Sequence, residues 1–245
     1  MIKLITLDLD NTLWDIDPVI IRAEKKMRAW ITDHVPEAVS YMEMDYIKGT
    51  FKRVLKNHPE LSHHPTNFRK KILYHTFLDA NLSNNDAQLR SEEAFYIFYK
   101  ERNQISLFHQ AESALEKISQ QFPIIALSNG NADLAMIGIK HLFKAHFSAE
   151  SEGKPKPHSN MFLKALDFAN VSPQETIHIG DHAEEDIQAA DALGFKTIWF
   201  NQDGKQPDHL CHPTLTITQI GMLPDAIERI KLALGHSSTT KKTPV

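Results

Sequence analysis

The sequence is nearly free of cysteine and has no strong excess of either charge. Its single cysteine, Cys211, excludes an intrachain disulfide and is typical of a reducing compartment. Acidic residues exceed basic ones by only 31 to 27, so the basic excess that usually marks a nucleic-acid-binding protein is missing. No apolar run approaches the roughly 20 residues of a membrane-spanning helix, and Asp8 and Asp10 interrupt the apolar start too early for a signal peptide. We therefore expect a cytoplasmic protein without nucleic-acid or membrane partners.

Short apolar runs alternate with amphipathic segments along most of the chain. Nearly unbroken apolar runs of this length are typical of parallel strands that are covered on both faces by helices. The expected strands are residues 2–7, 122–127, 176–179 and 196–200, with a weaker, alternating run at 214–218, and the expected helices between them are 109–121, 158–170 and 184–194. This order predicts an α/β fold, a doubly wound, Rossmann-like parallel sheet with right-handed crossovers.

A long helical stretch interrupts this alternation after the first expected strand. Residues 15–107 contain no convincing strand, and their apolar positions repeat at helical spacing. The expected helices are 18–34, 43–57, 65–80 and 86–104. We predict a core formed by residues 1–14 and 108–234, an inserted all-helical cap at 15–107, and a disordered tail at 235–245, where apolar residues are almost absent.

Acidic residues and a hydroxyl side chain follow two of the expected strands. The first strand ends in DLDNT, which places Asp8 and Asp10 at its tip, and the strand at 122–127 is followed by Ser128 and Asn129. Neighbouring buried carboxylates are costly unless a cation or a proton lies between them. A hydroxyl and free backbone N–H groups at a strand end form a cradle for an anion. Taken alone, the first motif is as compatible with an ordinary turn as with a site, and the second is more typical of a simple turn.

Two further segments carry charged residues at expected strand or helix ends. The segment EGKPKPHSNMF holds Lys154 and Lys156, each before a proline, and either lysine could neutralise a phosphate or simply lie in solvent. Asp181 follows the strand at 176–179, and Asp186 lies in the next helical turn. Both acids could ligate Mg²⁺ or merely stabilise a helix N-terminus. Because the carboxyl ends of parallel strands meet at one edge, we interpret the four segments as one site.

These four segments resemble the four motifs of the haloacid dehalogenase-like hydrolases, over residues 1 to about 225 with the inserted cap included. The resemblance implies phosphate-ester hydrolysis, with Asp8 as the nucleophile that forms an aspartyl-phosphate. It implies that Asp10 is first the general acid for the leaving alcohol and then the base that activates water. The inserted helices resemble the family's cap, which would act as a lid that excludes water and limits substrate size.

The resemblance also assigns the phosphate-binding residues and the metal ligands. Thr12, Ser128, Asn129 and Lys156 would serve the phosphate, Thr12 by supporting the loop around the nucleophile. The family's lysine precedes an aromatic residue by six positions, which selects Lys156 with Phe162 and leaves Lys154 as the fallback. Mg²⁺ would be bound by residues 8, 10, 181 and 186, with the Asp10 backbone carbonyl as one ligand and Asp186 steadying the cluster.

The substrate is the least specified part of the prediction. A dehalogenase needs neither a metal nor a second acid, so Asp10 and Asp181 favour a phosphatase. The motif segments look most similar to bacterial phosphatases of the riboflavin pathway, which act on flavin mononucleotide and on phosphorylated ribitylaminouracil. Trp14 is either a platform for a planar ring or a core aromatic. The alternatives are a broad sugar or nucleotide phosphatase and, in another class, a non-catalytic flavin- or nucleotide-binding regulator. We expect a monomer or a homodimer.

Overall fold

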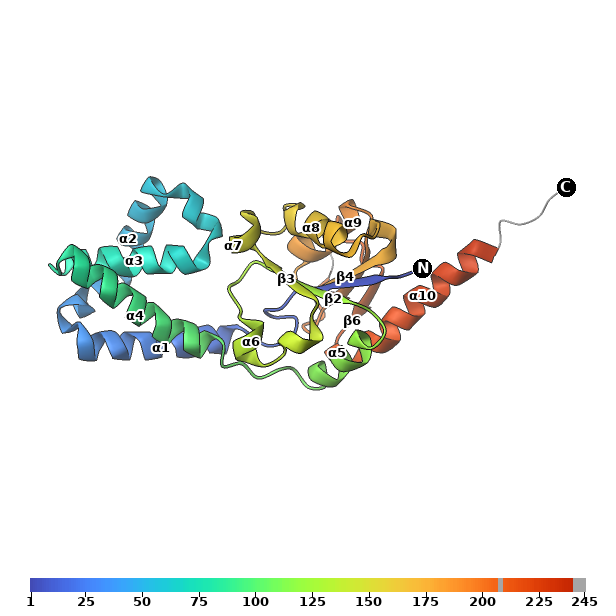
Figure 1. Cartoon of the computed structure of the whole chain (residues 1–245), viewed down its shortest axis with the longest axis horizontal. Helices are drawn as coiled ribbons and strands as arrows, with labels where there is room; N and C mark the ends of the chain where they lie inside the picture. The colour runs from blue at the N-terminus through green and yellow to red at the C-terminus, as the bar shows by residue number, and fades with distance from the viewer. Residues whose placement is uncertain (207–208, 240–245) are drawn as a thin grey trace. The chain divides into compact units, whose positions relative to one another are not determined.

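The computed structural model describes residues 1–206 and 209–239. The chain divides into two compact units (Figure 1). The core unit contains residues 1–15, 106–129 and the chain from residue 138 onward. The cap unit contains residues 16–105 and, in addition, the short segment 130–137, which the sequence did not indicate as part of the cap.

The core unit is built on a six-stranded, fully parallel sheet, so the predicted fold class is confirmed. The strand order is β3-β2-β1-β4-β5-β6. The strands are β1 (Leu4–Leu7), β2 (Ile124–Ser128), β3 (Ala145–Ser148), β4 (Thr176–Gly180), β5 (Lys196–Phe200) and β6 (Leu215–Ile217). The chain leaves central β1 towards β2 on one side and later returns to β4 on the other. This reversal creates a switch point at the carboxyl end of β1, where open α/β sheets bind ligands.

Helices cover both faces of the sheet. In Figure 1, α8 (Asn160–Ala169) and α9 (Ala189–Ala192) lie on one face, and α5 (Ala111–Ser119) and α10 (Leu223–Thr239) lie on the other. Every residue of β1, β2 and β4 is buried, which explains their nearly unbroken apolar sequences. The apolar side of α8, including Met161 and Phe162, packs against Leu4 and Ile125 of the sheet.

Short elements join the main ones in the core unit. They are α7 (Ala149–Glu152), the 3-10 turns Lys140–Leu142, Pro173–Glu175 and Ile220–Met222, and a π-helical segment, Ala183–Gln188, that leads into α9. Two sequence-based expectations need correction here. Strand β3 was missed because its sequence, AHFS, is short, half-buried and lacks an apolar run. The disordered tail was predicted to begin at Gly235, but α10 continues to Thr239. One glycine weakens a helix by about 1 kcal/mol without ending it. The rest of the predicted tail, residues 240–245, lies outside the described residues.

The regular secondary structure of the cap unit's described residues is entirely helical, as predicted. It contains α1 (Asp17–His34), α2 (Met44–Asn57), α3 (Pro65–Asp79), α4 (Asn84–Arg102), the short α6 (Leu134–Ile137) and the 3-10 turns Pro36–Met42 and Pro59–His63. Met27, Leu73, Phe77 and Phe98 are among the buried side chains that hold α1, α3 and α4 together.

Hydrogen bonds explain why residues 130–137 belong to the cap unit. The buried Arg102 donates from Nε to Oδ1 of Asn131, at 3.0 Å. Asn131 donates in turn to the hydroxyl of Thr66 at 3.1 Å, and the Asp133 N–H donates to Oδ1 of Asn103 at 2.8 Å. The segment that directly follows β2 and Asn129 is therefore tied to α4.

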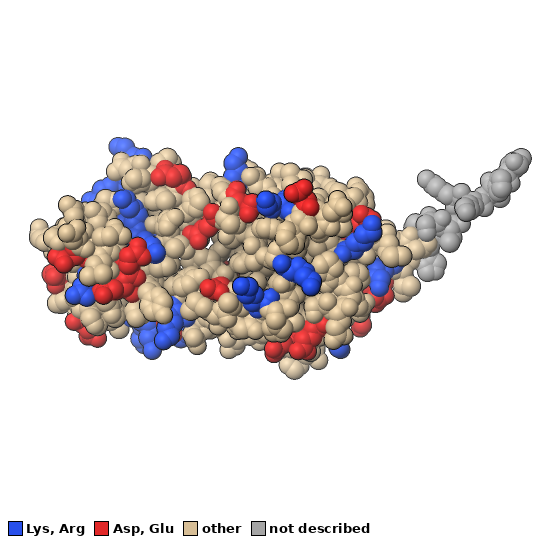
Figure 2. Space-filling view, viewed as in Figure 1, with Lys and Arg blue, Asp and Glu red and all other residues tan. Residues whose placement is uncertain are grey.

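The surface charge agrees with the nearly balanced composition. On the face shown in Figure 2, acidic and basic side chains are interspersed over both units. Among residues 1–206 and 209–239, no helix has the length and apolar character that crossing a membrane requires.

Candidate active site

The site forms where three neighbouring strands end. In-register pairing places Leu7 of β1 beside Ala126 of β2 and Ile179 of β4. Asp8 follows Leu7 directly, and its N–H donates to the Ile179 carbonyl at 2.9 Å. Asp181 follows the last residue of β4. The sheet register therefore brings acids that are more than 170 residues apart in sequence to the same edge.

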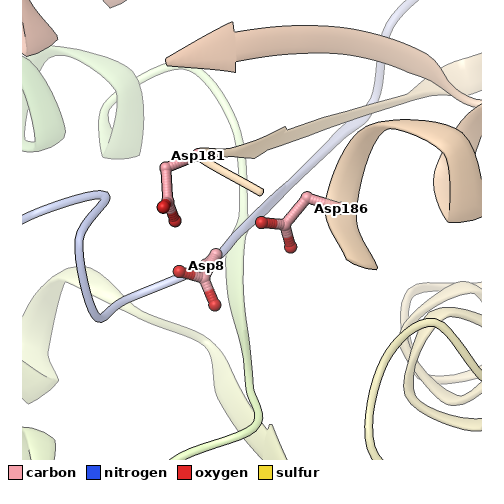
Figure 3. Close-up of side chains that lie close together, drawn as sticks. All are labelled: Asp8, Asp181 and Asp186. Carbon is pink, nitrogen blue, oxygen red and sulfur yellow. The ribbon is translucent and has the colours of Figure 1, made fainter. Parts of the chain in front are cut away.

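Three carboxylates gather at this edge. Each of Asp8, Asp181 and Asp186 offers an oxygen, and these oxygens lie within 4.8 Å of one another. Asp181 and Asp186 extend towards Asp8 from two sides (Figure 3). Gly180 makes this approach possible, since a Cβ atom at that position would collide with the side chain of Asp186. A hard divalent cation such as Mg²⁺ prefers this all-oxygen donor set, so these residues fit the predicted metal.

Lys156 is the cation that faces this cluster. Its ammonium lies 2.6 Å from Oδ1 of Asp8 and 2.5 Å from Oδ1 of Asp186, and the side chain is only 2% exposed. Lys154 is exposed in the preceding loop. The structure thus brings Lys156, and not Lys154, to the predicted nucleophile.

The hydroxyl of Thr12 lies between the carboxylates of Asp8 and Asp181. Its buried hydroxyl lies 3.1 Å from Oδ2 of Asp8 and 3.1 Å from Oδ1 of Asp181, so its single proton is donated to one of them at a time. Thr12 therefore orients carboxylates directly, which is closer to loop support than to phosphate binding.

The side chain of Asn129 binds the backbone of Lys156. Its Nδ2 donates to the Lys156 carbonyl at 3.0 Å and to Oε2 of Glu185 at 2.9 Å, while its Oδ1 accepts the Lys156 N–H at 2.7 Å. This amide clamps the backbone of Lys156 in place. Ser128 is the last residue of β2, so it lies at the carboxyl edge of the sheet, and it is buried.

His178 is a site residue that the sequence reasoning missed. It is fully buried in β4, where its Nε2 lies 3.1 Å from Oδ1 of Asp186 and its Nδ1 lies 2.9 Å from the hydroxyl of Thr6. Because a carboxylate only accepts, the ring donates from Nε2 to Asp186 and accepts at Nδ1 from Thr6. A histidine within an otherwise apolar strand was the one signal that pointed to this role.

Asp10 lies apart from the carboxylate cluster. Its side chain is half-buried, and its Oδ1 accepts a hydrogen bond from the indole N–H of Trp14 at 2.9 Å. Its side chain is not among the three that gather, and a metal contact through the Asp10 backbone carbonyl stays a prediction. Trp14 itself is fully buried, so of its two interpretations the structure favours the core aromatic over the platform for a substrate ring.

Burial and charge set the protonation of the cluster. Burial raises the pKa of Asp8 well above its usual value; Lys156 opposes this rise, and the charges of Asp186 and Asp181 add to it. Burial and the charge of Asp186 raise the pKa of Asp181 to about 6. Burial contributes most to both raised pKa values and like charge adds to it, and a bound cation would lower both by stabilising the ionised carboxylates.

The remaining buried groups are held in single protonation states. Burial opposes the ionisation of Asp186, but Lys156 and the hydrogen bond from His178 hold its pKa well below its usual value. Burial likewise disfavours the Lys156 ammonium, yet Asp186 and Asp8 hold its pKa above the ordinary range. Burial lowers the pKa of His178, which keeps the ring neutral near pH 7.

Comparisons with known proteins agree with this architecture. Residues 2–194 match the family model described as haloacid dehalogenase-like hydrolase. The chain is 30% identical to the 5-amino-6-(5-phospho-D-ribitylamino)uracil phosphatase YigB of Escherichia coli (strain K12), over 92% of this chain and 96% of that protein. It is 26% identical to a phosphoserine phosphatase of Thermus thermophilus, over 61% of each chain.

Solved structures give the same family. A 2-haloacid dehalogenase from Pseudomonas syringae pv. Tomato has a TM-score of 0.90 and 33% sequence identity, and the match covers 94% of this chain and 99% of that one. The HAD-hydrolase YfnB of Bacillus subtilis, whose structure is described as bound to magnesium, has a TM-score of 0.62 at 19% identity, with 92% and 98% covered, which shows the shared fold. The chain is therefore an enzyme of the haloacid dehalogenase-like hydrolase family.

Proposed function

We propose that this enzyme hydrolyses a small phosphate monoester with the help of Mg²⁺, through a phosphoryl group carried on Asp8. The observation that supports this most is the position of Asp8, which lies between two further acids and in contact with Lys156. A phosphatase has to bring a carboxylate up to a dianionic phosphate, and positive charge must offset that repulsion. When bound at the carboxylate cluster, Mg²⁺ would supply charge neutralisation for both the nucleophile and the phosphate.

In the first step, a carboxylate oxygen of Asp8 forms a bond to phosphorus as the bond to the leaving oxygen breaks. Asp10 donates its proton to that oxygen, which leaves as an alcohol. Lys156 neutralises charge at the reacting carboxylate, and the hydroxyl of Ser128 with the backbone N–H groups that follow β2 holds the phosphoryl oxygens.

In the second step, water attacks the phosphorus atom of the acyl-phosphate. Asp10, now a carboxylate, takes a proton from this water, and the bond between phosphorus and Asp8 breaks. Inorganic phosphate is released and Asp8 is again a carboxylate. Asn129 keeps Lys156 in place throughout, because its amide binds the lysine backbone on both its N–H and its carbonyl.

We propose phosphorylated ribitylaminouracil or flavin mononucleotide as the substrate. This rests on the 30% identity to YigB over nearly the full length of both chains and on the similarity of the motif segments to riboflavin-pathway phosphatases. A second candidate, release of halide from a 2-haloacid, is favoured by the likeness to the P. syringae structure. The presence of a second acid, Asp10, and of the Asp181 carboxylate weighs against it, since dehalogenation requires neither.

Phosphate release is the assay that tests this function. The panel contains the ribitylaminouracil phosphate, flavin mononucleotide, a sugar phosphate and a nucleotide, each with Mg²⁺ and with EDTA, and 2-chloropropionate is assayed for chloride release. We expect phosphate release that requires Mg²⁺, preference for the two flavin-pathway esters, and no release by Asp8→Asn. Chloride release without a metal would replace the proposal with the dehalogenase, and binding of the esters without turnover would replace it with a regulator.

A further inference from the structure

Trp14 is hydrogen-bonded to Asp10, the acid and base of the proposed reaction. Its indole Nε1–H donates to Oδ1 of Asp10 at 2.9 Å, and the side chain is 0% exposed. A buried indole N–H normally finds a hydrogen-bond partner. Here that partner is the carboxylate that acts as acid and then as base in the proposed function.

The backbone between these two residues is closed by its own hydrogen bonds. Asn11 adopts a left-handed conformation with φ of 62°, and its N–H donates to the Trp14 carbonyl at 2.8 Å. The Leu13 N–H donates to the Leu9 carbonyl at 2.8 Å, and the Leu13 carbonyl accepts the Phe108 N–H at 2.8 Å. The indole is therefore fixed with respect to Asp10 by the turn that carries both residues.

This contact distinguishes the two oxygens of Asp10. An oxygen that accepts the indole N–H along its lone pair is a poor place for the transferable proton, because an indole nitrogen only donates. We propose that Trp14 is a positioning residue whose N–H holds Oδ1 of Asp10, so that Oδ2 gives the proton to the leaving oxygen and later takes one from water. The indole keeps its own proton in both steps. The proposal rests on the proposed function, since it assumes that Asp10 is the acid and base.

A second tryptophan provides an internal comparison. The Trp199 indole N–H donates to the backbone carbonyl of Asp181 at 2.9 Å, so it supports the carboxylate cluster and does not contact Asp10. Trp30 lies in the cap unit, where it stacks on His34 with ring centroids 4.5 Å apart. The indole N–H groups of Trp14 and Trp199 thus bind different acidic residues, the first at a side chain and the second at a backbone carbonyl.

The test uses the dependence of rate on the leaving group. An aryl leaving group departs without much help from an acid, whereas an alkyl leaving group needs its proton. The value of kcat/KM reports the step in which the ester bond breaks, so we compare kcat/KM for glycerol 3-phosphate with that for p-nitrophenyl phosphate. Trp14→Phe is expected to lower this ratio about tenfold or more, a part of the roughly 10²–10⁴-fold contribution of a general acid.

Trp199→Phe and Trp30→Phe are the matched controls. Each removes one indole N–H, and neither is expected to change the ratio, although Trp199→Phe is expected to lower both rates together. A residue with a merely structural role would also lower both rates together. Because Trp14→Phe leaves a smaller side chain in a buried position, a second variant carries benzothienylalanine at position 14, in which sulfur replaces the N–H at nearly the same size.

The outcomes separate this proposal from the function on which it rests. Suppose that the wild-type protein releases phosphate and Asp8→Asn does not. An unchanged kcat/KM ratio in both Trp14 variants would then overturn the positioning role of Trp14 and leave the phosphatase function in place. Absence of phosphate release by the wild-type protein would overturn both. A lowered ratio in both Trp14 variants and in neither control supports the proposal.

Discussion

Replacing Lys156 by methionine removes the ammonium that lies 2.6 Å from Asp8 and 2.5 Å from Asp186, while keeping a side chain of similar length. Because the lysine is only 2% exposed, its loss leaves two buried carboxylates without their cation. Breaking a buried ion pair on one side typically costs about 3–5 kcal/mol of folding stability. We expect Lys156→Met to lose stability in this range at pH 8. Lys154→Met, in the exposed position two residues earlier, should stay within roughly 0.5 kcal/mol of the wild type.

The stability deficit of Lys156→Met is expected to grow as the pH rises. In the wild type, the raised pKa of Lys156 and the lowered pKa of Asp186 mean that both groups are charged and stabilising between pH 5 and 8. Without the lysine, burial dominates and raises the pKa of Asp186, so the folded variant binds protons more readily than the unfolded chain. Its stability therefore falls as pH rises above the unfolded value near 4, and the deficit is largest at pH 8 and smaller at pH 5.

Urea unfolding followed by tryptophan fluorescence at pH 5 and pH 8 measures this difference for both variants and the wild type. Excess Mg²⁺ is expected to recover part of the stability of Lys156→Met, since it offsets the same charges. A deficit of equal size in Lys154→Met, or one that does not change between the two pH values, would refute the assignment of Lys156 as the counter-charge of the cluster.

Further predictions concern the acids around Asp8. Gly180→Ala would drive its Cβ into the side chain of Asp186, so we expect a drop in Tm and at least a tenfold loss of phosphate release. The control is Gly49→Ala, because a Cβ added at that position on α2 meets open space. Near-normal activity of Gly180→Ala would contradict the close approach of Asp186 to Gly180. Asp10→Asn should abolish turnover with an unchanged circular dichroism spectrum, and retained turnover would rule out its acid–base role. Burial and the charge of Asp186 raise the pKa of Asp181 to about 6, so Mg²⁺ and protons compete for this carboxylate. The affinity for Mg²⁺, measured by titration calorimetry, should therefore be weaker at pH 5.5 than at pH 7.5. Equal affinities at the two pH values would place the ion elsewhere.

The sequence predicted the parts of the fold that depend on local patterns. Nearly unbroken apolar runs located β1, β2, β4 and β5, and the parallel arrangement followed from the helices between them. The same arrangement placed Asp8, Ser128 and Asp181 at one edge, because all three lie at the carboxyl ends of strands. Spacing to Phe162 chose Lys156 over Lys154, and the structure brings Lys156 to Asp8.

What the sequence did not reveal depends on contacts between distant residues. Nothing in the sequence AHFS predicts β3, because this segment is extended through its backbone pairing with β2 and not through a strand pattern of its own. The contact of His178 with Asp186 depends on which side of β4 its ring occupies. The assignment of residues 130–137 to the cap depends on hydrogen bonds from the end of α4, which no local pattern marks.

Trapping the phosphorylated enzyme tests the central claim most directly. The protein is mixed with p-nitrophenyl phosphate and Mg²⁺, quenched with acid during turnover, digested, and analysed by mass spectrometry, with Asp8→Asn treated in parallel. We predict one added phosphoryl group on the wild-type peptide that contains Asp8 and none on the variant peptide. Steady release of phosphate by the wild type with no phosphoryl group on that peptide, or equal release by Asp8→Asn, would contradict the account.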